Sequence, residues 1–386
     1  MRLPRCHDRK GVDPLRIGLE VSPLAINRTG IPNYIRRLLT GFASIPGDNT
    51  YFLYTNRPLP EDIRLPDNFH TVLLRRPLPR FQLWFQLALP GRLKKDRVDI
   101  FHGLFSRFPI RLPVPGVLTA YDLSGYSMPR LHKKWTHMTN LMYPAFVRKA
   151  AGIVAISRAT AREMEKYFPR ASSKVTVIPA AAPPEYAEVK DQERLRRTRE
   201  KLGLPERFIL FLGTIEPRKN LTRLLEAYMA AAGSIPHSLV ISGSVGWKTG
   251  EMFRELKSSG VRDRVQLTGF VDSEDIPALM TLAEIFVFPS LYEGFGLPIL
   301  EAMACGTPVV TSNVSSMREV AGDAALLVDP LSTDSIAEGL KELALDRGKR
   351  EELRRKGFRR AAQFSWTDIA GRTLQFYSDI LSRGNG

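Results

Sequence analysis

The sequence predicts an α/β protein made of two doubly wound, Rossmann-like domains that face each other across a cleft. Short apolar runs alternate with helical patterns along all 386 residues, which is typical of parallel sheets with crossover helices. A proline-containing and then highly charged stretch interrupts this alternation near the middle of the chain. Residues suited to binding an anion or a sugar follow several predicted strands, where open α/β sheets bind ligands.

The predicted strands fall into two sets. The first half contains seven of them, at 15–21, 51–54, 71–74, 98–102, 117–121, 153–156 and 175–178. The second half contains six, at 208–213, 238–242, 265–269, 285–289, 309–311 and 325–328. We therefore expect an N-terminal domain at 1–186, a linker at 187–205, and a C-terminal domain at 206–365. An amphipathic pattern predicts a final helix within 366–386 that packs back on the N-terminal domain.

Composition is that of a soluble globular chain, with 44% hydrophobic and 25% charged residues. No run of 18 apolar residues occurs, so no transmembrane helix is expected. The basic stretch Met1–Pro14 lacks the apolar core of a signal peptide. Only Cys6 and Cys305 are present, which excludes a disulfide framework and favours the cytoplasm.

The net charge of +16 indicates an anionic partner, which could be nucleic acid, a phospholipid surface or a phosphorylated substrate. The chain lacks the aromatic signature of an RNA-binding sheet, zinc-finger spacing and a basic tail. We therefore expect no nucleic-acid partner.

Residues 289–308 contain two carboxylates, Glu293 and Glu301, with seven residues between them. Gly294 and Gly296 let the backbone turn tightly and approach a ligand, and Pro298 suits the first turn of a helix. Free amides at that helix start favour an anion. The layout suits a sugar nucleotide, with one carboxylate for sugar hydroxyls, amides for phosphate and a second carboxylate for ribose.

A cationic pair, Arg218 and Lys219, follows the strand at 208–213 and precedes a predicted helix at 221–232. Arginine offers a fork to two phosphate oxygens, and lysine adds a compact charge. No Asp-x-Asp sequence occurs in the chain. We therefore expect these cations, without any metal, to stabilise a departing diphosphate.

These motifs resemble family 4 of the retaining, nucleotide-sugar-dependent glycosyltransferases, which have the GT-B fold. The resemblance is carried by 213–220, by Gly269-Phe270-Val271 and by the Glu293-x7-Glu301 element, and it extends from Gly30-Ile31 to 364–366. It implies that 1–186 binds the acceptor and 206–365 the nucleotide sugar.

The resemblance also implies a role for each matching residue. Arg218 and Lys219 would hold the diphosphate, Glu293 the donor sugar and Glu301 the ribose. The amides of Gly294, Phe295, Gly296 and Leu297 would meet sugar and phosphate, the backbone of Phe270 and Val271 would lie by the base, and Gly30 would approach the diphosphate from the other domain.

Two loops of the N-terminal domain are candidates for the acceptor side, one with His102 and one with Tyr121-Asp122. Many relatives carry a histidine at the Tyr121 position, so an imidazole role is in doubt here. A tyrosine hydroxyl can donate a hydrogen bond but does not titrate near neutrality. The catalytic candidates are thus Glu293, Arg218, Lys219, Tyr121 and Asp122. His102 is a weak acceptor-binding candidate, and a structural role for it is the favoured alternative.

Residues 75–111 combine nine arginines and lysines with apolar side chains that include Phe81, Trp84 and Phe85. Such a segment can rest on an anionic membrane surface, gaining about 1 kcal/mol per cation. The alternative, equally supported by the sequence, is a core packed beneath a solvated face. The first interpretation places a cytoplasmic protein at the inner face of the membrane.

The function predicted is transfer of a hexose, with retention and without metal or other cofactor, from a nucleoside-diphosphate sugar to a glycan or lipid-linked saccharide. Mannose from GDP-mannose is the first expectation, on family prevalence alone, and polysaccharide or lipopolysaccharide biosynthesis is the setting. Front-face attack is the mechanism expected, since no carboxylate of the first domain stands out as a nucleophile. A sugar-nucleotide epimerase, or an inactive protein that binds sugar nucleotides, stays open as the alternative.

Overall fold

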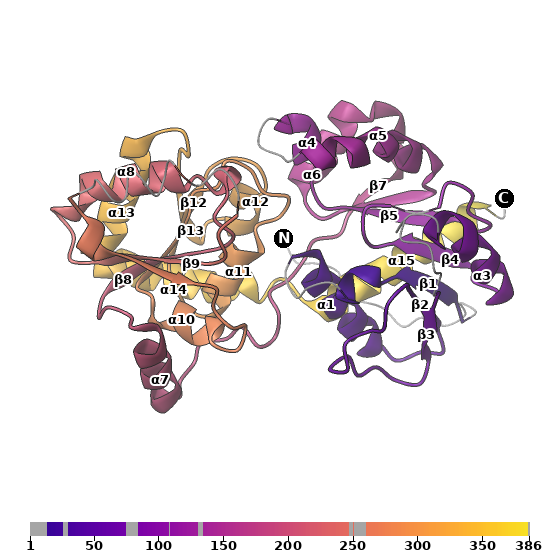
Figure 1. Ribbon diagram of the computed structural model, residues 1–386, viewed down its shortest axis with the longest axis horizontal. Coiled ribbons are helices and arrows are strands. Elements are labelled where there is room, and N and C mark those ends of the chain that lie inside the picture. The colour runs from indigo at the N-terminus through magenta and orange to yellow at the C-terminus, as the bar shows by residue number, and fades with distance from the viewer. Residues whose placement is uncertain are drawn as a thin grey trace. The chain divides into compact units, whose positions relative to one another are not determined.

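A computed structural model describes residues 14–25, 30–74, 84–107, 109–129, 134–246, 250 and 260–384. The chain forms two compact units (Figure 1): residues up to Ala180 join those from Ser365 onward, and residues 181–364 form the second unit. Cys6, the stretch at 75–83 and part of the first glycine loop, 26–29, lie outside the described residues.

The first unit contains a parallel sheet with the strand order β3-β2-β1-β4-β5-β6-β7. Its strands are β1 (Arg16–Glu20), β2 (Thr50–Thr55), β3 (Phe69–Leu73), β4 (Ile100–Gly103), β5 (Gly116–Ala120), β6 (Gly152–Ala155) and β7 (Val175–Val177). Strands such as β4 and β5 are buried along their whole length, because helices cover both faces of a parallel sheet. The strand order reverses between β1 and β4, which makes this the topological switch point.

Helices of the first unit are α1 (Ile31–Ala43), α3 (Leu89–Lys95), α4 (Ser124–Ser127), α5 (Lys134–Lys149), α6 (Arg158–Tyr167) and α15 (Trp366–Gly384). Short 3-10 turns η1 (Ser22–Ala25) and η4 (Pro169–Lys174) and a π-helical turn η2 (Trp84–Ala88) complete it. In the part of the chain that is described, no helix has both the length and the apolar character needed to cross a bilayer.

The second unit contains a parallel sheet with the order β10-β9-β8-β11-β12-β13. Its strands are β8 (Phe208–Leu212), β9 (Ser238–Ser242), β10 (Val265–Gly269), β11 (Ile285–Phe288), β12 (Val309–Ser312) and β13 (Ala325–Val328). Its helical elements are α7 (Gln192–Leu202), η5 (Pro217–Lys219), α8 (Leu221–Ala232), η6 (Arg262–Arg264), α10 (Ile276–Leu282), α11 (Leu297–Ala304), α12 (Met317–Ala321), α13 (Thr333–Leu345) and α14 (Arg347–Ala361). The switch point of this sheet lies between β8 and β11.

The two doubly wound sheets confirm the α/β class, and every predicted strand is present with its ends within two residues of the prediction. The structure differs from the expected linker at 187–205. The chain enters the second unit at Ala181, and α7 occupies most of that stretch. The side chain of Gln266 donates to the carbonyl of Leu202 and ties α7 to β10.

The charged composition of α7 has a local explanation. Arg196 pairs with Glu193 and Glu200 at distances of 2.8 and 2.6 Å, at helical spacings of three and four residues. Solvated ion pairs along a surface helix therefore produce the same composition as a flexible linker, and only the packing of α7 separates the two.

The C-terminal helix α15 belongs to the first unit and packs against α1. At Gly41 of α1 a side chain would lie 2.4 Å from the carbonyl oxygen of Trp366, so only glycine permits this close approach. The hydroxyls of Ser44 and Thr367 lie 2.9 Å apart across the same contact. The chain thus returns to the unit where it began, as expected for 366–386.

Candidate active site

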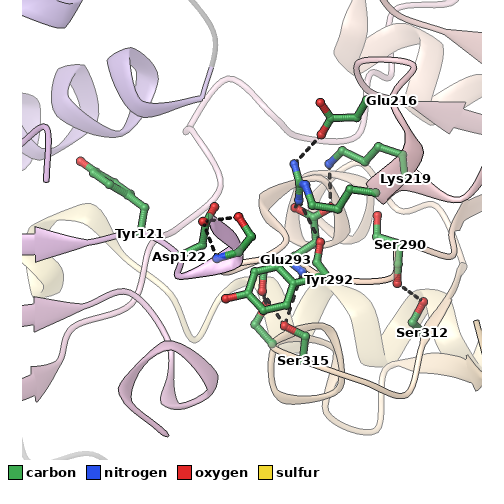
Figure 2. Close-up of polar contacts among 12 residues, drawn as sticks. Tyr121, Asp122, Glu216, Lys219, Ser290, Tyr292, Glu293, Ser312 and Ser315 are labelled. Atoms are coloured by element: carbon green, nitrogen blue, oxygen red, sulfur yellow. Dashed lines mark hydrogen bonds and ion pairs between the residues drawn. The ribbon is translucent and has the colours of Figure 1, made fainter. Parts of the chain in front are cut away.

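The predicted cationic loop and the predicted glutamate loop leave neighbouring strands of the second sheet. β8 leads into η5, which carries Arg218 and Lys219, and β11 leads into the loop that carries Glu293. β8 and β11 pair in parallel, so their carboxyl ends lie side by side at the switch point. Figure 2 shows the result: Lys219 and Glu293 point toward each other, with Glu216 beside them.

Glu293 receives an ion pair on each carboxylate oxygen. Lys219 Nζ lies 2.7 Å from Oε1, and an Arg218 guanidinium nitrogen lies 2.8 Å from Oε2. Arg218 also pairs with Glu216 at 2.8 Å, and Lys219 Nζ lies 4.5 Å from the centre of the Phe288 ring. Glu216, Lys219 and Glu293 are buried, so their mutual contacts fix the positions of all these charges.

Burial and charge act in opposite directions on Glu293. Burial by itself raises its pKa, but Lys219 and Arg218 outweigh this and hold the pKa below its ordinary value. Burial lowers the pKa of Lys219, against the attraction of Glu293. Glu293 is therefore a charged carboxylate at neutral pH, and a further anion beside Lys219 would favour the charged lysine.

The start of the glutamate loop has no regular secondary structure, and the cationic loop holds its main chain. Asn220 donates from Nδ2 to the carbonyl of Pro289 at 3.1 Å, and it has the left-handed φ of 62° at the end of η5. The Arg218 guanidinium donates to the carbonyl of Tyr292 at 2.8 Å, and the main-chain carbonyl of Arg218 accepts from the amide of Leu291 at 2.9 Å. The two loops are therefore one hydrogen-bonded unit.

A serine clamp, defined as Ser312, Ser315 and Ser316, holds the same loop from β12. Ser312 donates to the carbonyl of Ser290 at 2.7 Å (Figure 2). Ser315 and Ser316 both donate to the carbonyl of Glu293, at 2.7 and 2.8 Å. Ser315 has a φ of 56°, a strained value for a residue other than glycine. The clamp fixes the backbone from which the Glu293 side chain projects.

The expected glycine-loop helix is α11. Gly296 precedes it with a φ of 96°, a conformation that suits glycine, and Pro298 lies in its first turn. Glu301 lies one turn further along the helix and is partly buried. Phe295 is buried against Phe364 at a ring distance of 6.0 Å.

The other predicted donor residues lie on neighbouring loops. Gly294 is buried and Leu297 is partly buried at the start of α11. Phe270 follows β10 with 67% of its surface exposed, while Val271 is buried. In the first unit, Gly30 precedes α1 with a φ of 57°. These positions are compatible with the implied roles.

Tyr121 and Asp122 follow β5 and bond to groups of the first unit. Tyr121 is buried, its hydroxyl donates to the carbonyl of Leu104 at 2.7 Å, and burial raises its pKa well above the ordinary value. Asp122 is exposed and accepts from the amide and hydroxyl of Ser124, at 3.1 and 2.6 Å. In this structure the Tyr121 hydroxyl is thus occupied by the main chain.

His102 fits the structural alternative. It is 1% exposed, and its ring nitrogens lie 2.5 Å from the Tyr377 hydroxyl and 2.7 Å from the Thr119 hydroxyl. Burial lowers its pKa to about 3. A buried, neutral imidazole with both nitrogens bonded joins β4 and β5 to α15 and offers no free group to an acceptor.

Sequence reasoning missed Glu216, Asn220 and the serine clamp. Glu216 and Asn220 flank the cationic pair, so their position in that loop was the available signal. The serines form a cluster directly after a predicted strand, which is the edge where ligands bind. Nothing in the sequence shows that the partners of these serines are main-chain carbonyls 22 or 23 positions away.

The arrangement can bind and stabilise a diphosphate. Two fixed cations and the first amides of α11 supply donors for phosphate oxygens, and buried surroundings strengthen such contacts. Glu293 supplies a carboxylate that can accept hydrogen bonds from sugar hydroxyls.

Comparison with protein families matches both halves of the chain. Residues 194–360 match the model described as glycosyl transferases group 1, and residues 28–186 match the model described as glycosyltransferase family 4. O-antigen chain mannosyltransferase B of Escherichia coli is 33% identical over 304 residues, which cover 78% of this chain and 77% of that protein. The serotype-specific mannosyltransferase WbdA of the same organism is 35% identical over 238 residues, 60% of this chain but only 29% of that protein.

Solved structures show the same fold over nearly the whole chain. Sucrose-phosphate synthase from Thermosynechococcus elongatus has a TM-score of 0.73 at 24% identity, covering 96% of this chain and 100% of that one. HepE from Anabaena, solved with UDP and glucose, has a TM-score of 0.74 at 17% identity, covering 95% and 100%. These similarities show that the fold is GT-B.

Proposed function

Because this chain belongs to glycosyltransferase family 4, we propose that it transfers a mannosyl residue from a nucleoside-diphosphate mannose to a growing saccharide chain. The relatives that are 33–35% identical carry the name mannosyltransferase, and one of them is named for the O-antigen chain. The single observation that carries the chemistry is the ion-paired group of Arg218, Lys219 and Glu293 at the switch point of the second sheet.

The experiment that tests the donor is a turnover screen with purified full-length protein. GDP-mannose, UDP-glucose, UDP-galactose, ADP-glucose and dTDP-glucose are each incubated with it, and release of the nucleoside diphosphate is measured. We expect release from GDP-mannose, with Glu293→Gln as the matched inactive variant. If only another donor releases its nucleoside diphosphate, that donor replaces GDP-mannose in the proposal. If Glu293→Gln releases nucleoside diphosphate as fast as wild type, the proposed active site is wrong.

We further propose that transfer proceeds with retention by front-face attack. The bond between the sugar C1 and the diphosphate oxygen breaks, C1 bonds to the acceptor oxygen, and the acceptor proton goes to the departing diphosphate. Arg218 and Lys219 would stabilise the charge that develops on that leaving group. NMR of the product tests this, since an α-linked donor must give an α-linked product, and a glycosyl ester trapped on the protein would contradict the single-face route.

Metal independence is also part of the proposal. Its support is the pair of cations, which can supply the charge stabilisation that a divalent ion supplies elsewhere. Turnover in EDTA should equal turnover in magnesium. A loss in EDTA that magnesium restores would show that the cations do not suffice.

The proposal also includes binding of the protein to an anionic membrane surface, where a lipid-linked acceptor would lie. In the described part of the basic segment, Lys94, Lys95 and Arg97 are exposed, and Leu87 is 63% exposed beside them. Phe85 and Leu89 are buried, so the aromatic contribution expected from the segment is partly core. Sedimentation with phosphatidylglycerol vesicles at low salt should exceed that with phosphatidylcholine, and equal sedimentation would contradict the proposal.

A further inference from the structure

The two sheets place charged side chains at equivalent positions. In the second sheet, the loops after β8 and β11 carry the cations and Glu293. In the first sheet, the strands at the switch point are β1 and β4, which pair in parallel (Figure 1). Glu20 is the last residue of β1, and Arg107 lies in the loop after β4. The switch point of the first sheet therefore also carries a carboxylate and a guanidinium.

We propose that Glu20 and Arg107 form a binding site for the hydroxyl groups of a neutral sugar, which rests on the proposed function because that sugar would be the acceptor. Arg107 contacts the sugar, and Glu20 is the positioning residue that holds the guanidinium and balances its charge.

Glu20 is completely buried, and only part of its hydrogen-bonding capacity is used. Its Oε1 accepts from the Ser22 hydroxyl and from an Arg107 nitrogen, the latter at 3.3 Å, and the main chain of Phe105 also interacts with the carboxylate. Its Oε2 is buried with no hydrogen-bond partner among the described residues. A buried carboxylate oxygen without a donor is costly, and such atoms mark places where a ligand or water completes the site.

Burial and the neighbouring groups act in opposite directions on this carboxylate. Burial raises the pKa of Glu20, while Arg107 and the Ser22 hydroxyl lower it, and the net direction is upward. If Arg107 moved away, the buried Glu20 carboxylate would lose its main charge partner. The cost of that loss keeps the Arg107 guanidinium in place when a ligand binds.

Arg107 is held by aromatic rings as well as by Glu20. Its guanidinium carbon lies 4.8 Å from the centre of the Phe105 ring and 5.1 Å from that of Phe85. The Arg107 side chain is 15% exposed, and Phe105 is partly buried. Of the Glu20–Arg107 pair, the planar Arg107 guanidinium is the part that reaches the surface, and the Phe105 ring lies beside it. This combination suits a polar ligand with apolar C–H faces.

The loop that carries Arg107 is fixed at two further points. Ser106 has a left-handed φ of 53°, and its hydroxyl donates to the carbonyl of Thr119 at 2.9 Å. Tyr121 donates to the carbonyl of Leu104 at 2.7 Å. Tyr121, a catalytic candidate in the sequence, is thus a positioning residue for the loop, and its hydroxyl holds the main chain.

The chemistry of the pair favours a neutral hydroxyl. A hydroxyl group can accept from the Arg107 guanidinium, while the buried Glu20 carboxylate holds that guanidinium in place. An anionic group would have to compete with Glu20 for the Arg107 guanidinium. A neutral sugar can take hydrogen bonds from Arg107 without breaking the ion pair.

The experiment uses full-length wild type and the variants Glu20→Gln, Arg107→Gln and Tyr121→Phe. Saturation-transfer NMR with methyl α-D-mannopyranoside, methyl α-D-glucopyranoside and methyl α-D-galactopyranoside measures sugar binding without donor. Calorimetry with GDP and UDP measures nucleotide binding separately. We expect wild type to bind at least one glycoside, with affinity about tenfold or more weaker in Glu20→Gln and Arg107→Gln and unchanged nucleotide affinity. Tyr121→Phe should show a smaller loss.

The matched control is Arg36→Gln, which removes another guanidinium–carboxylate pair of the same unit, Arg36 with Asp62 at 3.2 Å. It should leave glycoside binding unchanged, and melting temperatures identify any variant that fails to fold. Absence of glycoside binding in wild type, or equal binding in folded Arg107→Gln, overturns the site. Absence of nucleotide binding in wild type overturns the proposed function instead, so the two failures are distinguishable.

Discussion

Lys219 and Glu293 are 74 positions apart in the sequence, yet Lys219 Nζ lies 2.7 Å from Glu293 Oε1. Both side chains are buried, and each follows one of the two strands at the switch point of the second sheet. A buried pair of this kind adds little net stability, because desolvation offsets the attraction. Its value is a fixed arrangement of charge at the edge of the sheet where ligands bind.

Breaking this pair from one side should separate stability from activity. Lys219→Met removes one of the two cations paired with the buried Glu293 carboxylate, and Glu293→Gln removes the carboxylate that pairs with the buried Lys219. Each loss should be up to about 3–5 kcal/mol of unfolding free energy when the remaining group stays charged. The double variant should recover part of that stability. Turnover of the donor should fall about 100-fold or more in all three.

The measurements are urea unfolding and release of nucleoside diphosphate. Lys201→Met is the control, since Lys201 pairs with Asp275 at 2.7 Å while 56% of its side chain is exposed. It should change both quantities little. Recovery of turnover in the double variant would show that the pair is structural only.

The serine clamp should affect catalysis more than nucleotide binding. Ser315→Ala with Ser316→Ala removes both donors to the carbonyl of Glu293 and shifts the loop, so we expect kcat to fall about tenfold while the Kd for the nucleoside diphosphate stays within twofold. Ser315→Gly relieves the backbone strain at φ 56° and still lacks the hydroxyl, which separates strain from hydrogen bonding. Ser172→Ala, an exposed serine of the first unit, is the control. An unchanged kcat in the double variant would argue against the clamp.

Acid should weaken the second unit through Glu284. Glu284 accepts from Arg207 at 2.8 Å and lies 2.9 Å from His237 Nε2. Burial acts to raise its pKa, but these partners lower it from 4.5 to about 2. Its contribution to stability is therefore full above about pH 4.5 and is lost as the pH falls toward 2.

Urea unfolding between pH 3 and pH 7 checks this. Glu284→Gln should be less stable than wild type at pH 7, and its stability should fall less between pH 5 and pH 3. Glu338→Gln, which changes an exposed carboxylate of α13, should follow the wild-type curve. Parallel curves for wild type and Glu284→Gln would contradict the assignment.

Tyr377→Phe tests the structural role of His102. Loss of the tyrosine hydroxyl leaves a buried imidazole nitrogen unpaired, which should cost about 1–3 kcal/mol of unfolding free energy. The pKa of His102 is lowered to about 3 from 6.5, so its neutral form contributes stability above about pH 6.5 that declines as the pH falls toward 3. At a temperature where the variant is folded, its KM for acceptor should equal that of wild type. A raised KM for acceptor with unchanged stability would indicate that His102 acts in acceptor binding and not in structure.

Local patterns predicted the secondary structure well because each strand is a short apolar run between turn residues. The helix of residues 221–232 was predicted to the residue, since Asn220 turns the chain before it and Gly233 follows its last turn. The linker predicted at 187–205 differs from the structure for the opposite reason. Its charged residues pair along one helix, and its membership in the second unit comes from contacts with α10 and β10 that local composition does not encode.

The site divides in the same way. Loop chemistry predicted Arg218, Lys219, Glu293 and Glu301, because a cationic pair and a two-carboxylate glycine loop are both local sequence features. The structure brings the first three into contact, and the role of Glu301 stays a prediction. Tyr121 and His102 were also named from their loops, but the structure occupies the first with a carbonyl and buries the second between a tyrosine and a threonine.

The amino-acid sequence by itself determined the alternation of strands and helices, the family and the side chains at the edge of the second sheet, since each of these depends on short local stretches of sequence. Tertiary structure alone decided which groups meet: the pairing of Lys219 with Glu293, the serine clamp, and the contact of Glu20 with Arg107. The physical reason is that each of these contacts joins the carboxyl ends of different strands or the loops that follow them, and parallel pairing, rather than proximity along the chain, sets their distance.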